Sequence, residues 1–315
     1  MARSNRSKLE IAQERKSRDS RIQREAKQRD TTPELIRKQV AFALFFQRIF
    51  SQEDSRWMLL GGNALLIRTG YGRFTQDIDL SRDEQWDDLG DIQEEIEGLL
   101  RQGDRADEFD FEITKVAAHS EPDIYGYGAK TAKLTVRVDF GGKQFDIFTI
   151  DITSRKHITS AVEHLQLKPV LEDAVLTDLP KIPTVPAENH MADKICALYE
   201  KHQGEKQRPS TRYRDLADVV RFIQDVPLNA NRLALVIGHE SHRRKIIPPQ
   251  RLIAPDESWT KNYPQAARDF AQYPPHLLPL DKALEYAGTC LNEILDGTRT
   301  TGHWNPAQQR WDKTN

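Results

Sequence analysis

A glycine pair followed by two carboxylates one residue apart constrains this chain more than any other feature. Gly61 and Gly62 come shortly before Asp77 and Asp79. Residues two apart on a β-strand point to the same face, so the two aspartates are expected to project together. Aligned carboxylates can hold Mg²⁺, which prefers oxygen ligands and keeps substrate phosphates in its coordination shell. Glycines let backbone N–H groups approach a phosphate without side-chain obstruction, so the segment predicts a metal–nucleotide site.

A bare Asp-x-Asp is also common as a strand-end cap or a surface turn. A site that transfers phosphoryl or nucleotidyl groups usually has a further carboxylate, which helps to bridge two metal ions. Asp139, Asp146 and Asp151 are the candidates on the strands that follow. Asp151 is preferred because it stands alone among strand-forming residues. Asp139 adjoins a hairpin, and Asp146 lies an odd number of residues from Asp151, which turns it to the opposite face.

Composition excludes several other classes of protein. The 315 residues are long enough for one large domain or two ordinary ones. No apolar run approaches the roughly 20 residues of a membrane span, and no hydrophobic signal segment follows Met1, so no membrane contact and a cytoplasmic location are expected. Two cysteines are too few for a disulfide framework, and no Cys/His group has the spacing of a zinc site.

The charge of the chain is unevenly distributed. Residues 1–30 contain ten Lys or Arg against five Asp or Glu, so the remainder of the chain, whose total is −2, carries about −7. A uniformly basic nucleic-acid surface is therefore excluded, and a polyanion would have to use local patches. Residues 1–30 have few large apolar side chains and are predicted to form a solvated basic arm, either helical or disordered.

The remaining pattern predicts an α/β (α+β) core at 31–183, a helical domain at 184–297 and a tail at 298–315. Prolines 180, 183 and 186 mark the boundary between the first two. Thr32 and Pro33 predict a helix start. Expected strands cover 57–60, 78–80, 109–116, 133–140 and 145–153, the last two joined by a glycine hairpin. Expected helices cover 31–50, 63–68, 87–100, 188–201, 211–224, 230–239 and 280–296.

Several short motifs together carry a resemblance to a known family. They are Gly61-Gly62-Asn63-Ala64-Leu65, Arg73-x-Thr75-x-Asp77-Ile78-Asp79-Leu80, Ala192-Asp193-Lys194 and Arg214-Asp215-Leu216-x-Asp218. In order and spacing the chain resembles the AbiEii/AbiGii family, nucleotidyltransferase toxins of type IV toxin–antitoxin and abortive-infection systems that include mycobacterial tRNA-modifying toxins. The resemblance covers about half of the chain, from Trp57 to Ile223.

The resemblance implies a polymerase-β-like nucleotidyltransferase core with a mixed sheet and a helical C-terminal domain. It also implies metal binding by Asp77 and Asp79, and essential roles for Lys194 and Asp215. The implied cofactors are two Mg²⁺ ions, with Mn²⁺ as an alternative. The implied partners are an NTP, an RNA acceptor such as tRNA, and an antitoxin encoded nearby. Many members have Ser or Thr where this chain has Asn63, whose amide can still donate to a phosphate oxygen.

The types of residue at these positions also suit a nucleotide-binding site. Gly61, Gly62 and Asn63 would cradle the triphosphate, and Thr75, two residues before Asp77, would place its hydroxyl near the phosphates. Lys194 lies beside an apolar helical stripe, from which its ammonium arm could neutralise the β- and γ-phosphates. Asp215 could orient Lys194 or contact the nucleotide; a purely structural salt bridge between two helices is the alternative.

Two further features have competing explanations. Arg243, Arg244, Lys245 and Arg251 form the densest basic patch outside the arm and could hold an RNA backbone, although a solvated loop is equally consistent. Trp259, Tyr263 and Tyr273 could stack on bases, with core packing favoured. The sequence therefore predicts a metal-dependent nucleotidyltransferase, and the family resemblance implies a toxin whose acceptor is an RNA, such as the 3′ end of tRNA. The alternatives are a nucleotidyltransferase acting on a protein or small molecule, and a non-catalytic nucleotide-binding module.

Overall fold

The computed structural model describes residues 6–52, 55–70, 73–101, 107–118, 129–154, 158, 160–201 and 209–312. The chain divides into two compact units. Unit 1 comprises Met1–Asn63, Thr75–Lys156 and Glu163–Thr184, and unit 2 comprises Ala64–Phe74, His157–Val162 and Val185–Asn315. Within the described ranges, no helix has the length and apolar character required to cross a membrane.

Unit 1 is built on a seven-stranded mixed sheet with the order β3-β4-β5-β2-β1-β7-β6. The β1–β7 and β2–β5 pairs are parallel and the other pairs are antiparallel. This mixed sheet confirms the predicted α/β class. The strands are β1 (Trp57–Leu59), β2 (Asp77–Arg82), β3 (Phe109–Ala118), β4 (Thr131–Phe140), β5 (Lys143–Thr153), β6 (Glu163–Gln166) and β7 (Lys181–Thr184).

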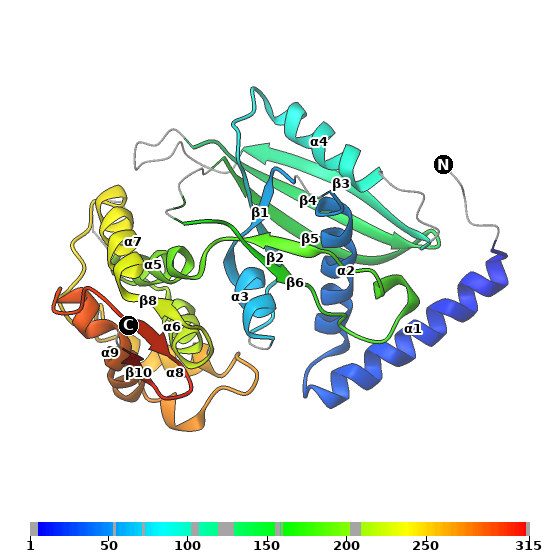
Figure 1. The fold of residues 1–315 in the computed structure, drawn as a ribbon. Helices are drawn as coiled ribbons and strands as arrows, with labels where there is room; N and C mark the ends of the chain where they lie inside the picture. Colours follow the sequence, from blue (N-terminus) through cyan, green and yellow to red (C-terminus); the bar gives the residue numbers. More distant parts are fainter. Residues whose placement is uncertain are drawn as a thin grey trace. The chain divides into compact units, whose positions relative to one another are not determined.

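The helices of unit 1 are α1 (Lys8–Gln28), α2 (Pro33–Ile49) and α4 (Leu89–Arg101), with the short 3₁₀ turn η1 (Ala174–Leu176). As predicted, α2 begins with Pro33 after Thr32, whose side chain accepts a hydrogen bond from the amide of Leu35. Helix α2 covers one face of the sheet (Figure 1), where Phe42 and Phe45 pack edge-on against Phe148 of β5. Side chains of opposite parity on β5 therefore point to the other face of the sheet.

The β4–β5 hairpin follows the sequence pattern closely. Alternate residues of β4 are buried, and the turn is formed by Gly141 and Gly142, both with positive φ. A bulge near Asp139 shifts the register before the turn. Asp146 is ion-paired with Lys38 of α2 at 2.8 Å, so it lies on the face of the sheet that α2 covers. This agrees with the prediction that Asp146 and Asp151 point to opposite faces.

The predicted solvated arm is instead a helix with a buried face. Arg18, Ile22 and Ala26 of α1 are buried. The guanidinium of Arg18 pairs with Asp173 at 2.8 Å and lies over the rings of Phe109 and Phe140. Composition alone missed this docking because an arginine can be buried when a carboxylate neutralises its head and aromatic rings pack against it.

Unit 2 is mainly helical. Trp259 and Tyr263 are fully buried in its core and Tyr273 nearly so, which confirms packing rather than base stacking for these aromatics. The described part of the predicted tail is also packed, since Trp304 is buried and donates a hydrogen bond to the carbonyl of Ile223 at 2.8 Å. The elements are α5 (Ala187–Tyr199), α6 (Tyr213–Asp225), β8 (Leu228–Asn229), α7 (Ala230–Arg243), α8 (Trp259–Ala267), η2 (Pro275–Leu277), α9 (Leu280–Leu295), β9 (His303–Asn305) and β10 (Arg310–Asp312). Helix α3 (Gly61–Thr69) begins in unit 1 and continues into unit 2.

Candidate active site

The two carboxylates of the opening motif lie on β2, next to a third carboxylate on β5. Asp77 and Asp79 alternate with the buried Ile78 and Leu80, so both project to the face opposite α2. The parallel pairing of β2 with β5 places Asp79 directly opposite Asp151. Adjacent strands lie about 4.8 Å apart, so the register brings the preferred third carboxylate beside the Asp-x-Asp pair.

Gly61 lies against the carboxylate of Asp79. It has a φ of +62°, and a Cβ built on it would lie 2.7 Å from Asp79 Cγ and closer still to its oxygen. The amide of Leu60, just before it, donates to the backbone carbonyl of Asp79 at 2.9 Å. Only glycine can combine this left-handed backbone with so close an approach. The glycine pair and the Asp-x-Asp motif are therefore one local structure, and the glycines belong to the first turn of α3, which was expected to begin at Asn63.

Asn63 and Thr75 precede the Asp-x-Asp pair in the sequence. The side chain of Asn63 has a hydrogen-bond partner in the described structure, and that of Thr75 has none. The side-chain amide of Asn63 is buried and donates to the backbone carbonyl of Asp77 at 2.8 Å, so it braces the start of β2. Thr75 precedes the strand rather than lying on it. Its hydroxyl is buried and has no hydrogen-bond partner within the described part of the chain.

Asp151 has a basic partner in the structure. Lys133 of β4 lies directly opposite it and forms an ion pair with it at 3.0 Å. Within the described residues, no three His, Cys, Asp or Glu side chains are arranged as a ready metal-binding set. The backbone thus aligns three carboxylates on one face, while the side chain of the third is held by a lysine.

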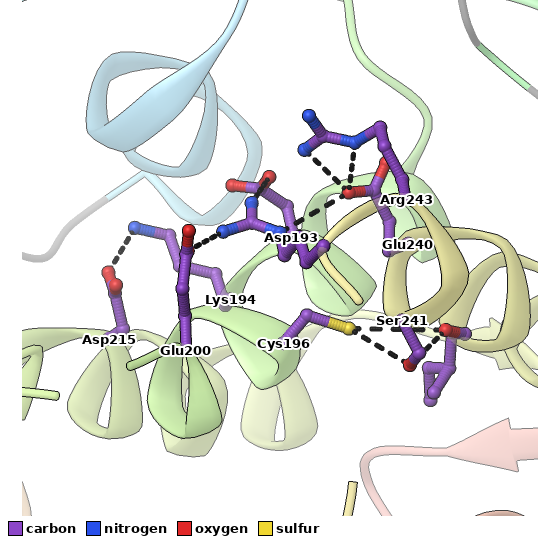
Figure 2. Close-up of polar contacts among 10 residues, drawn as sticks. Asp193, Lys194, Cys196, Glu200, Asp215, Glu240, Ser241 and Arg243 are labelled. Atoms are coloured by element: carbon purple, nitrogen blue, oxygen red, sulfur yellow. Dashed lines mark hydrogen bonds and ion pairs between the residues drawn. The ribbon is translucent and has the colours of Figure 1, made fainter. Parts of the chain in front are cut away.

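In unit 2, Lys194 of α5 is buried between two carboxylates of α6. Its Nζ lies 2.7 Å from Asp215 Oδ1 and 2.7 Å from Asp218 Oδ2, and Figure 2 shows the side chain directed at Asp215. Burial by itself would lower the pKa of Lys194, but the two carboxylates outweigh it and raise the pKa above its usual value. The lysine is therefore a fixed cation, and the predicted Lys194–Asp215 pair exists.

Two more groups complete this buried cluster. Arg73, from the segment before Asp77 in the sequence, approaches Asp218 at 3.5 Å. His190, one helical turn before Lys194, is buried with its ring edge-on to Phe222, and neither ring nitrogen has a hydrogen-bond partner among the described residues. Burial, reinforced by the positive charges of Lys194 and Arg68, lowers the pKa of His190 to about 3, so the ring is neutral.

The predicted basic patch of Arg243, Arg244, Lys245 and Arg251 is neutralised at its first two members, whereas Lys245 and Arg251 are exposed. Arg243 pairs with Glu240 at 2.8 Å, a contact drawn in Figure 2. Arg244 pairs with Asp193 of α5 and with Glu200, which follows the end of α5. Arg244 therefore holds the end of α7 against α5, whereas Arg243 is paired within α7. Because both guanidinium groups have carboxylate partners, neither is available as a phosphate surface.

The comparisons with known proteins decide the family. A family model described as "Nucleotidyl transferase AbiEii toxin, Type IV TA system" matches residues 43–287. The chain belongs to the AbiEii family. It is thus a nucleotidyltransferase of a toxin family, and the resemblance read from its motifs is confirmed.

Solved structures similar to this AbiEii chain have low sequence identity to it. MenT4, a nucleotidyltransferase toxin from Mycobacterium tuberculosis H37Rv, is 18% identical, with a TM-score of 0.47 over 70% of this chain and 68% of MenT4. JHP933 from Helicobacter pylori is 13% identical, with a TM-score of 0.45 over 83% of this chain and 93% of that one. No curated protein matches the chain.

The AbiEii chain thus groups its predicted site residues in two sets. Unit 1 brings together Gly61, Asp77, Asp79 and Asp151, and unit 2 brings together Lys194 and Asp215. Sequence reasoning did not assign roles to Asp218, Arg73 and His190. A signal existed for Asp218, since it lies three residues after Asp215 and therefore on the same face of α6. No signal in the sequence pointed to the burial of His190.

Proposed function

We propose that this AbiEii protein is a metal-dependent toxin that transfers a nucleoside monophosphate from an NTP to the 3′ end of an RNA such as tRNA. The observation that carries the proposal is the register of β2 and β5, which aligns Asp79 with Asp151 beside Asp77. A hydroxyl of the acceptor attacks the α-phosphate, and pyrophosphate leaves. The RNA acceptor follows from the resemblance to tRNA-modifying toxins of the family.

The carboxylates fit a metal cofactor. Asp77, Asp79 and Asp151 offer hard oxygen ligands on one sheet face, and Gly61 leaves the space beside Asp79 that a side chain would fill. These three residues would hold two Mg²⁺ ions, or Mn²⁺, which when bound would supply charge stabilisation for the triphosphate. Lys133 would have to release Asp151 for this, and its side chain, 43% exposed, can turn into solvent.

The remaining residues bind and orient the nucleotide in this proposal. Backbone N–H groups at Gly61 and Gly62, at the N-terminal turn of α3, are suited to phosphate oxygens. Asn63 holds the start of β2 in place, and Thr75 offers a hydroxyl that lacks a hydrogen-bond partner in the described structure. Lys194 and Asp215 are essential for the transfer, as the resemblance implies, with Asp215 orienting the Lys194 ammonium.

The proposed biological setting is a toxin–antitoxin pair in the cytoplasm. The family description places its members in type IV systems, so an antitoxin gene is expected next to the gene for this chain. A small regulator encoded upstream would support this setting.

Labelled NTPs test the proposed reaction. The protein is incubated with each NTP, Mg²⁺ or Mn²⁺, and separate pools of total RNA and total protein. Label on RNA that disappears with EDTA and in Asp79→Asn, but not in Asp110→Asn, is expected; Asp110 is an exposed carboxylate of β3 and serves as the matched control.

Each alternative function has its own result in the same experiments. Label on protein alone, or on a small molecule, would overturn the RNA acceptor while keeping the enzyme class. Growth inhibition that survives Asp79→Ala would favour a non-catalytic nucleotide-binding module.

A further inference from the structure

Helix α1 has an inner face that anchors it to unit 1. Arg18 and Arg21 both pair with Asp173, at 2.8 Å, and Arg15 donates to the carbonyl of Phe140. Ile22 and Ala26 complete this face. The helix is therefore held in place on the same unit as Asp77 and Asp79, and its position relative to them is defined.

The acidic residues of α1 are occupied by local partners. Glu14 pairs with Arg18 and Arg21, and Asp19 pairs with Arg37 of α2. Glu25 pairs with Arg29 at 2.6 Å. Glu10 forms the capping box with Ser7. Three of the four acids of α1 thus have arginine partners, and the fourth, Glu10, lies at the N-terminal end of the helix.

Four cations of α1 remain exposed, and within the described residues none of them has an ion-pair partner: Lys8, Lys16, Arg24 and Lys27. At 3.6 residues per turn, Lys16, Arg24 and Lys27 lie within about 80° of one another, on the side away from Ile22. These three cations span about 17 Å along the helix axis. Lys8 points in the direction of the buried Ala26 and is not on this side. We call Lys16, Arg24 and Lys27 the α1 basic face.

The basic patch of Arg243, Arg244, Lys245 and Arg251 leaves two of its cations, Lys245 and Arg251, exposed. Arg243 and Arg244 are neutralised by Glu240, Asp193 and Glu200, and the chain beyond residue 30 has a net negative charge. A polyanion is attracted to unpaired cations aligned on a rigid element and repelled by an acidic surface.

We infer that the α1 basic face binds the phosphate backbone of the RNA acceptor. This inference rests on the proposed function, because it assigns the surface to the substrate of that reaction. Contacts to phosphates position an RNA without reading its sequence. The α1 basic face therefore contributes affinity for RNA in general and leaves the choice of nucleotide to the residues around Asp77 and Asp79.

A charge-matched pair of variants tests the inference. In the first, Lys16, Arg24 and Lys27 are replaced by Gln, which has a helix propensity close to that of Lys and Arg. In the control, Lys168, Lys181 and Lys261 are replaced by Gln; these lysines are exposed and dispersed. Both changes alter the net charge equally. Circular dichroism and thermal unfolding check that both variants are folded.

The binding of in vitro transcribed tRNA is measured at several salt concentrations. Each phosphate contact contributes about 0.7–0.9 to the slope of log K against log salt, so the α1 variant should reduce the slope by about 2 and the control by less than about 1. In the NMP-transfer assay the α1 variant should raise KM for RNA about tenfold or more and leave kcat unchanged, since its residues do not contact the reacting groups.

The outcomes separate the inference from the proposed function. If the wild type labels RNA and the α1 variant retains wild-type affinity, the inference is wrong and the proposed function stands. Equal losses in both variants would show that net charge, not the α1 basic face, sets the affinity, and would overturn the inference. If the α1 variant loses binding to phosphatidylserine vesicles but still binds RNA as the wild type does, the α1 basic face binds a membrane. That result would also overturn the inference. If the wild type labels only protein, the proposed acceptor fails.

Discussion

Gly61 and Asp79 are in direct contact across the first turn of α3 and the middle of β2. A Cβ on Gly61 would lie 2.7 Å from the carboxyl carbon of Asp79, on a backbone with φ of +62°. A glycine is therefore required both by the backbone conformation and by the space that the carboxylate occupies.

Gly61→Ala should disrupt the site more than the fold. The left-handed conformation costs an L-residue about 1–2 kcal/mol, and the new methyl group must displace the Asp79 carboxylate. A displacement of this size can cost about 100-fold in rate, measurable as NMP transfer. Gly98→Ala in α4, where no atom lies within 4 Å of the added Cβ, is the control and should retain activity. Equal activity of the two variants would contradict the role of Gly61.

Asp218→Asn should destabilise unit 2 more than Asp215→Asn. Asp218 is only 1% exposed and faces both Lys194 and Arg73. Its loss removes the carboxylate that pairs with Arg73 and leaves Lys194 with Asp215 alone, at a cost of about 3 kcal/mol. Asp215→Asn leaves the Lys194–Asp218 pair in place. Urea unfolding followed by fluorescence measures the difference.

Activity should follow a different order from stability in the same variants. Asp215→Asn is expected to lower the rate of NMP transfer by about tenfold or more, because the ammonium of Lys194 loses one of the two groups that orient it. If folded Asp215→Asn keeps wild-type activity, the Lys194–Asp215 pair is only a structural salt bridge between two helices. That is the alternative stated in the sequence analysis.

His190 should make the protein sensitive to acid. Its pKa is about 3 in the folded protein against a usual value of 6.5, through burial and then the charges of Lys194 and Arg68, partly opposed by Asp193 and Asp218. Between pH 6.5 and about 3 the unfolded chain binds the extra proton, so this contribution to stability is complete above 6.5 and is lost as the pH falls. The slope is at most about 1.4 kcal/mol per pH unit.

Replacing His190 by Leu removes this proton uptake. The pH dependence of the free energy of unfolding should become shallower between pH 6.5 and 4, measured by urea titrations at each pH. His276→Gln, at an exposed position, is the control and should keep the wild-type profile. An unchanged profile in His190→Leu would show that another group takes up the proton.

Arg18→Ala should release α1 from unit 1. The buried carboxylate of Asp173 would lose one of its two arginine partners, and Phe109 and Phe140 would lose the guanidinium packed on them, at an expected cost of about 3 kcal/mol. Amide hydrogen exchange along residues 8–28 should accelerate. Arg24→Ala, on the exposed side, should change stability by less than about 0.5 kcal/mol; similar exchange in both variants would contradict the anchoring role of Arg18.

Local periodicity made much of unit 1 predictable. The period of two along a strand is a property of the backbone, so the shared face of Asp77 and Asp79, the buried alternation of β4 and the reversed orientation of Asp146 could be read from spacing alone. Thr32 and Pro33 marked the start of α2 because capping is also local. Lys194 and Asp215 were placed on neighbouring helices by their motifs, and the structure pairs them.

Only the tertiary structure decided which partners these residues meet. The pairing of Asp79 with Asp151 depends on two strands distant in the sequence, and the contact of Gly61 with Asp79 depends on how a helix start meets a strand. Burial of Arg18, His190 and Asp218 depends on aromatic rings and counter-ions from other elements. The sequence by itself determined which side chains share a face of one element; the packing between elements, which no local pattern encodes, determined the charge and environment of each.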